Sequence, residues 1–382
     1  MSLQRTAPLF DQTLFAGWSL TYLIGVLKSG LVQEFPLTGV QIVLSGSLLT
    51  LYRNAILIPV VMRLRSEGHL EIRHPTLGIL GATGLSVAYS TIAAANGAPI
   101  AFVVFVSLVL VLSLMVDTLR TLERAIGKLR LCLLANGIWT VVSGAALGLL
   151  TFDVISFSTF AAAHLLGGLA AASILFLFHS ARLRNIRFVK KSTPFSKSPA
   201  VQKSQMGLPL LEQMAVFTSA QLIGQFGPTG AVPVLLATQL LTSPTYLFAQ
   251  SARQMGLSGA TDLSDGGGRP VPILALVLLY LSTLGVFFPL LSETLNILSP
   301  AHVVLTAVGL TSFLQIANGT MTGHSFQLLQ AKTVRRAAVV GAVVRLLQVL
   351  VLLVLHAPVD SFWFVSIIPL ISTIATLRLL SR

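Results

Sequence analysis

Residues 98–130 read APIAFVVFVSLVLVLSLMVDTLRTLERAIGKLR, an apolar run followed by a short basic stretch. A helix that spans a bilayer needs about 20 mostly apolar residues, and Lys and Arg after such a helix keep that end in the cytoplasm. The pattern recurs along the chain, with basic clusters at 63–73, 120–130, 182–203, 253–269, 332–336 and 378–382. It predicts a polytopic membrane protein whose helices have a fixed orientation.

The composition excludes a soluble protein. The 382 residues are 54% hydrophobic and only 10% charged, whereas soluble domains carry about 25% charged residues. The net charge of +13 is spread over short loops, where basic side chains orient helices and contact anionic lipid head groups. We therefore expect membrane lipids as partners and no nucleic acid. The single cysteine, Cys132, excludes a disulfide framework and a multi-cysteine metal site.

Apolar segments of spanning length occur about twelve times. Placing the N-terminus, every second loop and the C-terminus in the cytoplasm puts all but three of the 25 Lys and Arg there. The short junctions at 96–99 and around 228 leave a count of ten open. We expect a multi-pass protein with both termini in the cytoplasm. The segments lie near 13–33, 39–62, 75–94, 98–117, 130–150, 157–180, 210–228, 231–251, 271–290, 299–319, 336–356 and 361–380.

The longest polar stretch, residues 182–208, falls between the sixth and seventh segments and is typical of a cytoplasmic linker. It separates an N-terminal lobe at 1–181 from a C-terminal lobe at 209–382. The tripeptide Leu-Ile-Gly at 23–25 recurs at 222–224, a weak sign of an internal repeat. An even number of spans gives both halves the same orientation. The predicted fold class is an all-α polytopic membrane protein with about 12 transmembrane helices in two six-helix lobes.

Motifs for catalysis are missing from the sequence. It has no His-Glu-x-x-His pair for zinc, no Gly-x-Ser-x-Gly motif and no Gly-rich loop ending in Lys-Ser/Thr for ATP. We interpret Asp262 and Asp265, beside three glycines in a predicted cytoplasmic loop, as part of a turn. We predict a transport protein and not an enzyme, with no cofactor and no metal.

Three basic residues inside predicted spans are not explained by topology: Lys28, Arg53 and Arg345. A charge at this depth is costly, so it usually faces a bundle interior or a watery cavity. Arg53 is either a cavity-lining cation that meets an anionic substrate or the structural partner of an acidic or carbonyl group. The same functional and structural interpretations apply to Arg345. Lys28 lies near an outer helix end, where its side chain could also reach toward the surface.

Amide and aromatic side chains at helical spacing form a second group of candidates. Aromatic rings stack on the C–H faces of sugars, and amides bond to hydroxyl groups, so the group is suited to a sugar ligand. The alternative is that the amides hold helices together. The group consists of Trp18, Tyr22, Gln221, Gln225, Gln315 and Asn318.

Acidic residues are predicted only at or near span ends, as for Asp117 and Asp153. His164 is therefore interpreted as a hydrogen-bonding residue and not as a proton relay. An exporter driven by protons or sodium ions ordinarily needs a buried carboxylate. Buried cations without buried acids favour an anionic, lipid-linked substrate.

Three motifs stand next to segments five, eight and eleven. They are Arg-Ala-Ile-Gly-Lys at 124–128, Gly-Ala-Val-Pro-Val-Leu-Leu-Ala-Thr-Gln at 230–239, and Leu-Leu-Gln-Ala at 328–331 with Arg335 and Arg336. Together with the twelve-segment layout, they resemble the multidrug/oligosaccharidyl-lipid/polysaccharide (MOP) flippase superfamily, particularly its bacterial polysaccharide flippases. The resemblance implies two lobes around a central cavity lined by segments one, two, seven and eight. The chain departs from that pattern in being short, with minimal loops and no clear glycine pairs in segment eight.

The resemblance also implies a cargo and a location. The cargo would be a polyprenyl-diphosphate-linked oligosaccharide or another anionic amphiphile, moved across the bacterial inner (plasma) membrane by alternating access. A glycan polymerase or other synthesis machinery would be a partner. The implied cargo contacts are Lys28, Arg53, Gln221, Gln225 and Gln239.

Three alternatives stay open. Residues 88–116 are similar to small-metabolite exporters of the ten-helix drug/metabolite type, which have inverted five-helix halves. A major-facilitator carrier shares the six-plus-six plan, but residues 63–68 lack the Gly-x-x-x-Asp-Arg pattern of that family. The chain could also be a non-catalytic membrane subunit of a polysaccharide synthesis complex.

Overall fold

The computed structural model describes residues 3–57, 60, 69–70, 73–125, 129–183, 187–188, 199–258, 270–295, 297–327 and 331–380. The chain divides into two compact units, Met1–Lys197 (unit 1) and Ser198–Arg382 (unit 2). Within the described residues, each unit contains six long helical segments. The predicted all-α fold with two sets of six helices is confirmed.

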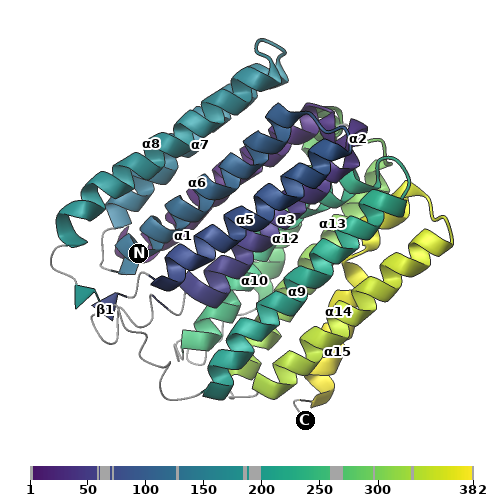
Figure 1. The fold of residues 1–382 in the computed structure, drawn as a ribbon. Helices are drawn as coiled ribbons and strands as arrows, with labels where there is room; N and C mark the ends of the chain where they lie inside the picture. Colours follow the sequence, from purple (N-terminus) through teal and green to yellow (C-terminus); the bar gives the residue numbers. More distant parts are fainter. Residues whose placement is uncertain are drawn as a thin grey trace. The chain divides into compact units, whose positions relative to one another are not determined.

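Unit 1 is built from long helices (Figure 1). A short helix, α2 (Leu31–Glu34), connects the first two, and the two-residue strands β1 (His69–Leu70) and β2 (Arg187–Phe188) form one parallel pair. The helix α3 passes directly into a π-helical turn, η1 (Arg53–Leu57). The long helices are α1 (Leu3–Lys28), α3 (Pro36–Tyr52), α5 (Arg73–Ala95), α6 (Ile100–Ala125), α7 (Leu129–Thr151) and α8 (Phe157–Leu183).

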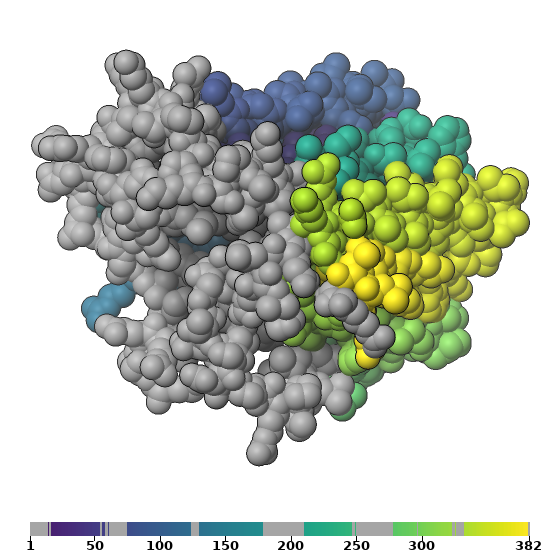
Figure 2. All heavy atoms as spheres, turned by 90° about the horizontal axis from the view of Figure 1, so that it is seen from below, coloured from purple at the N-terminus to yellow at the C-terminus, as the bar shows by residue number. Residues whose placement is uncertain are grey.

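Unit 2 repeats this plan. Gly230, with a φ of 96° that favours glycine, stands in the turn between its first two helices. A 3-10 turn, η2 (Val359–Phe364), precedes the last helix. Figure 2 shows the yellow-green and yellow residues of the last two helices packed against each other. The long helices are α9 (Pro199–Phe226), α10 (Ala231–Ser258), α12 (Pro270–Thr294), α13 (Ala301–Gln327), α14 (Ala331–Val354) and α15 (Ile367–Leu380).

Corresponding helices pack together in the two units. In unit 1, α7 contacts α1 and α8, while α6 contacts α3, α5 and α8. In unit 2, α14 contacts α9 and α15, while α13 contacts α10, α12 and α15. These are the same pairs in the same chain order. The packing therefore supports the internal repeat that the Leu-Ile-Gly tripeptide predicted.

Seven helices in the described part of the chain are each long and apolar enough to cross a bilayer. Shorter apolar helices cover Pro36–Tyr52 and Leu278–Thr294. The chain is a multi-pass membrane protein, and the cytoplasmic position of both termini stays a prediction. The seven spans are Pro75–Ala95, Ile100–Glu123, Arg130–Thr151, Phe157–Phe178, Ala301–Thr322, Lys332–Val354 and Val359–Leu380.

Helices continue beyond the predicted spans, because polar residues such as Lys, Gln and Arg also support a helix. The helix α6 runs on to Ala125, past the predicted span end at residue 117. The helix α9 begins at Pro199, inside the stretch 182–208 that was predicted as a linker. Residues 184–186 and 189–198 of that stretch lie outside the described residues. The predicted lobe boundaries stay a prediction.

Candidate functional site

Arg53 is held by an acidic group inside unit 1. It stands where α3 passes into the π-helical turn η1, and its Nε donates to Asp117 Oδ2 at 2.7 Å. Arg120 Nη2 donates to Asp117 Oδ1, also at 2.7 Å. Arg53 therefore has the acidic partner that the structural interpretation of this residue required. Its contact with a cargo stays a prediction.

The predicted position of Asp117 at a span end is wrong. It lies within the spanning segment Ile100–Glu123, because α6 continues past it, and it has no exposed surface. Glu123 on the same helix is buried as well. Unit 1 therefore contains buried carboxylates, and the argument that the interior holds cations without acids is wrong. The group around Asp117 is an ion-pair network in which two guanidinium groups share one carboxylate.

Lys28 ends α1 and lies 3.8 Å from Asp153, measured from Nζ to Oδ1. The Asp153 side chain is 82% exposed, so the pair contributes about 1 kcal/mol or less. Lys28 thus has a weak acidic partner at a helix end. Its role as a cargo contact stays a prediction.

Trp18 and Tyr22 belong to a buried aromatic cluster of unit 1. Trp18 stacks on Trp139 with ring centroids 3.9 Å apart, and the Tyr22 ring lies 5.6 Å from the ring of His164. Trp18 is 2% exposed and Tyr22 is 6% exposed. The Nδ1 atom of His164 is hydrogen-bonded to Ser143 Oγ at 2.8 Å, in line with the structural role expected for this histidine. Both rings are enclosed by other side chains, and their role as cargo contacts stays a prediction.

Gln225 and Gln239 are exposed, and Gln221 is partly exposed. From residue 231 to residue 242 of α10, every position is buried except Gln239. The helices α9 and α10 contact each other and are joined by a short turn. At 1.5 Å per residue, Gln221 and Gln239 lie about 8 Å and 12 Å along their helices from that turn. We call Gln221, Gln225 and Gln239 the amide set of unit 2.

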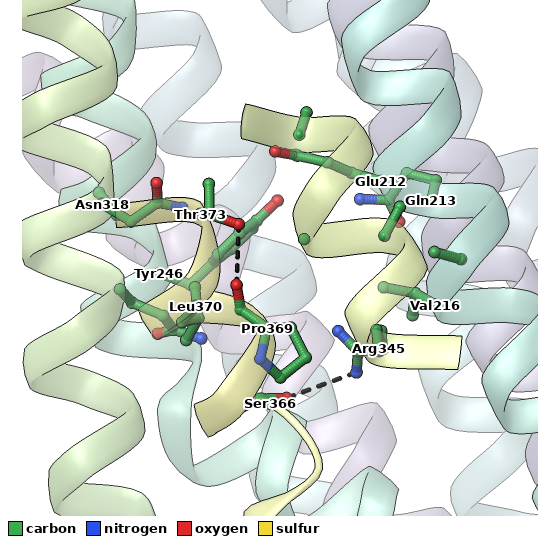
Figure 3. A pocket seen from close by; sticks show the side chains of 16 residues that line it. Glu212, Gln213, Val216, Tyr246, Asn318, Arg345, Ser366, Pro369, Leu370 and Thr373 are labelled. Atoms are coloured by element: carbon green, nitrogen blue, oxygen red, sulfur yellow. Dashed lines mark hydrogen bonds between the residues drawn. The ribbon is translucent and has the colours of Figure 1, made fainter. Parts of the chain in front are cut away.

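Gln315, Asn318 and Arg345 line one cavity of about 150 Å³ inside unit 2 (Figure 3). Residues of α9, α10, α13, α14 and α15 form its walls. Arg345 Nη2 donates to Ser366 Oγ at 3.4 Å, and Gln315 Oε1 lies 2.9 Å from Thr245 Oγ1. The structure thus brings together three of the predicted site residues, from α13 and α14. The other seven predicted residues do not line this cavity.

Several lining residues were not predicted as site residues: Glu212, Tyr246, Ser366 and Thr373. Glu212 lies just inside the predicted seventh segment, 210–228, where it is one of the acidic residues near a span end. The sequence signal that was missed is an acidic residue in the seventh segment together with a basic residue in the eleventh. The two lie near one cavity because α9 and α14 pack together. Among the described residues, no group of three or more His, Cys, Asp and Glu could hold a metal ion.

No protein-family model and no curated protein matches the chain. Solved structures do match it. An inward-facing multidrug-resistance MATE-family transporter of the MOP superfamily is 14% identical, with a TM-score of 0.51 over 99% of this chain and 94% of the other. An outward-facing MATE-family transporter of the same superfamily is 13% identical, with a TM-score of 0.51 over 98% and 94%.

A MOP-superfamily transporter from Pyrococcus furiosus Vc1, described as having a binding pocket of reverse polarity that suggests a different function, is 13% identical. Its TM-score is 0.50 over 98% of this chain and 94% of the other. At these identities the likeness concerns the fold. The predicted resemblance is confirmed at that level: this chain has the fold of the MOP-superfamily transporters.

Proposed function

We propose that this protein translocates a lipid-linked oligosaccharide, carried on a polyprenyl diphosphate, across the membrane by alternating access. The fold supports a transporter. The three motifs next to segments five, eight and eleven support the polysaccharide branch of the superfamily. In the orientation predicted from the basic loops, the head group enters from the cytoplasmic side while the lipid tail stays in the bilayer.

The observation that carries this proposal is the exposure of Gln239. It is the one exposed position from residue 231 to residue 242, where every other position is buried. A polar side chain at membrane depth faces a bundle interior or a watery cavity rather than lipid. Gln221 on the neighbouring α9 lies at a similar depth. Amides donate and accept hydrogen bonds, which suits the many hydroxyl groups of an oligosaccharide.

The pairing of Arg53 supports a larger role for the sugars than for the diphosphate in cargo recognition. Arg53 is held by Asp117 at 2.7 Å, whereas Lys28 has only a weak contact with the exposed Asp153. A cation that already has a carboxylate partner attracts a second anion less strongly. The basic cytoplasmic loops instead attract the anionic diphosphate first. In this proposal the neutral amide set selects the glycan.

A multidrug exporter is the second candidate. The MATE-family structures that share this fold are of multidrug-resistance transporters. Buried carboxylates such as Asp117, which the sequence argument had excluded, remove one objection to an ion-driven exporter. The Pyrococcus furiosus transporter is described as differing in pocket polarity and function within the same fold, so the fold does not decide between the two candidates.

The test is translocation of lipid-linked oligosaccharide in a bacterial strain depleted of its own flippase. We expect the parent protein to restore translocation and Gln239→Leu to reduce it about tenfold, as for the loss of one to two ligand hydrogen bonds. Thr283→Val is the matched control, because Thr283 is exposed on α12 and its hydroxyl bonds to its own helix at Leu279 O. Both variants must reach the membrane in equal amounts.

The same strains are scored for ethidium accumulation. If the parent lowers ethidium accumulation and leaves oligosaccharide translocation unrestored, the protein is an exporter and the proposal is wrong. If Gln239→Leu translocates the oligosaccharide as well as the parent does, Gln239 does not bind the cargo and the proposal loses its main support.

A further inference from the structure

The cavity of unit 2 contains a guanidinium group that is poorly satisfied by the protein. Arg345 Nε is buried and has no hydrogen-bond partner among the described residues. Its Nη2 has one long hydrogen bond, to Ser366 Oγ at 3.4 Å. A guanidinium group has five N–H donors in a rigid fork that matches a carboxylate or a phosphate. Most of the binding capacity of this fork is therefore unused.

The charge of Arg345 also lacks a close counter-ion. In the described part of the chain, no carboxylate forms an ion pair with it, in contrast to Arg53 and Lys28. It stands in the middle of the span Lys332–Val354, where an unpaired charge is costly. An oxyanion from a ligand would supply the missing partner.

One acidic residue lines the same cavity. Glu212 on α9 acts electrostatically on Arg345 without approaching it closely enough to pair. Figure 3 shows the two side chains apart, with Arg345 joined to Ser366 and with Thr373 and Pro369 in the space beside them. A purely anionic ligand would be repelled by Glu212, and a purely cationic one by Arg345. A ligand that carries both charges complements both side chains.

The size and the remaining walls restrict this ligand further. A volume of about 150 Å³ is below the range of roughly 300–1,000 Å³ that drug-sized ligands occupy. Small residues of α14, Ala338, Gly341 and Ala342, leave this space open. A Cβ atom on Gly341 would collide with the Thr373 hydroxyl. Gln315 and Asn318 add amides that can donate or accept.

We propose that this cavity binds a small zwitterion, with its oxyanion on the Arg345 guanidinium and its ammonium group on the Glu212 carboxylate. The ligand joins α9 to α14 inside unit 2. This site is distinct from the amide set and does not depend on the identity of the transported cargo. Two sources offer the same chemistry: a free amino acid, and the phosphoethanolamine head group of a membrane lipid.

Thermal unfolding of the full-length protein in detergent tests the proposal. The probes are β-alanine and γ-aminobutyrate as zwitterions, acetate as the anion alone and methylammonium as the cation alone, all at equal ionic strength. We expect at least one zwitterion at about 10 mM to raise Tm by roughly 2–4 °C, and the single-charge probes to leave it unchanged. A second arm compares phosphatidylethanolamine vesicles with phosphatidylglycerol vesicles. Stabilisation by the former alone would identify the head group as the source.

The variants connect the effect to the cavity. Arg345→Gln and Glu212→Gln each remove one charge and should abolish the shift, and Ala342→Leu should abolish it by filling the space while keeping both charges. Arg336→Gln and Glu293→Gln are matched controls, because these residues are exposed and do not line the cavity. They should keep the full shift. The proposal is wrong if acetate stabilises as well as the zwitterions, if no probe or lipid stabilises the parent, or if the three cavity variants respond like the controls.

Discussion

Asp117 is the residue on which the charge balance of unit 1 depends most. It is fully buried and accepts 2.7 Å hydrogen bonds from Arg53 and Arg120. Asp117→Asn keeps the volume of the side chain but leaves two guanidinium groups without their carboxylate. Breaking a buried pair in this way costs about 3–5 kcal/mol. We expect a loss of that size in the free energy of unfolding, measured by titration with a denaturing detergent.

Asp153→Asn is the control for this prediction. Its side chain is 82% exposed and its partner Lys28 is 3.8 Å away, so the change should cost about 1 kcal/mol or less. If both substitutions have the same small effect, the Asp117 network does not stabilise unit 1. The comparison uses the same chemical change at two depths, so only burial and pairing differ.

The partners of the charged residues could not be predicted from the sequence. The three unexplained cations were found because a charge inside an apolar segment is conspicuous. The acidic partners of Arg53 and Lys28 come from distant parts of the chain: Arg53 and Asp117 are 64 residues apart. Which two side chains meet depends on how each helix is rotated about its axis, and hydropathy does not contain that information. The same holds for Trp18 and Tyr22: helical spacing predicted that they share a face, but their neighbours on that face, Trp139 and His164, come from other helices.

At the scale of the helices, Gly319 permits a close backbone approach between α10 and α13 in unit 2. A Cβ atom on Gly319 would lie 2.6 Å from both Ala249 Cα and Ala249 O. Because those atoms are backbone, the two helices themselves would have to separate. Small residues at such contacts allow membrane helices to pack closely. We expect Gly319→Ala to lower the free energy of unfolding by about 1–3 kcal/mol, as other overpacking substitutions do.

Gly144→Ala in α7 provides the comparison for Gly319. No atom lies within 4 Å of a Cβ built there, so the substitution should change stability by less than about 0.5 kcal/mol. A slight gain is also consistent, because alanine favours the helix. Equal losses at the two positions would mean that helix propensity and not the α10–α13 contact governs the response.

The helices themselves were largely predictable, because a bilayer imposes a length and an apolar composition on every span. Their ends were not. The helix α6 passes Asp117 and ends at Ala125, and α9 begins at Pro199, because backbone hydrogen bonding continues where the apolar segment stops. The π-helical turn at Arg53 and the 3-10 turn before α15 leave no mark in hydropathy either.

For the whole molecule, the alternation of basic loops and the repeat of helix pairs both bear on the membrane topology. Six spans in each half, as the sequence predicts, would return the chain to the side of the membrane from which it started. The turns at Gly97 and Pro228, which left the count of spans open, each join two long helices. Both turns should therefore lie on the outer face, opposite the basic clusters.

Cysteine labelling tests this topology with little interference, because Cys132 is the only native cysteine and is buried. In a Cys132→Ser background, we expect Gly97→Cys and Pro228→Cys to react with a membrane-impermeant maleimide in intact cells. Ser192→Cys, in the predicted cytoplasmic stretch, should react only after the membrane is permeabilised. Labelling of Ser192→Cys in intact cells would reverse the predicted orientation. If Gly97→Cys or Pro228→Cys reacts only after permeabilisation, the chain does not cross the bilayer twelve times, and the two units cannot be parallel six-helix repeats.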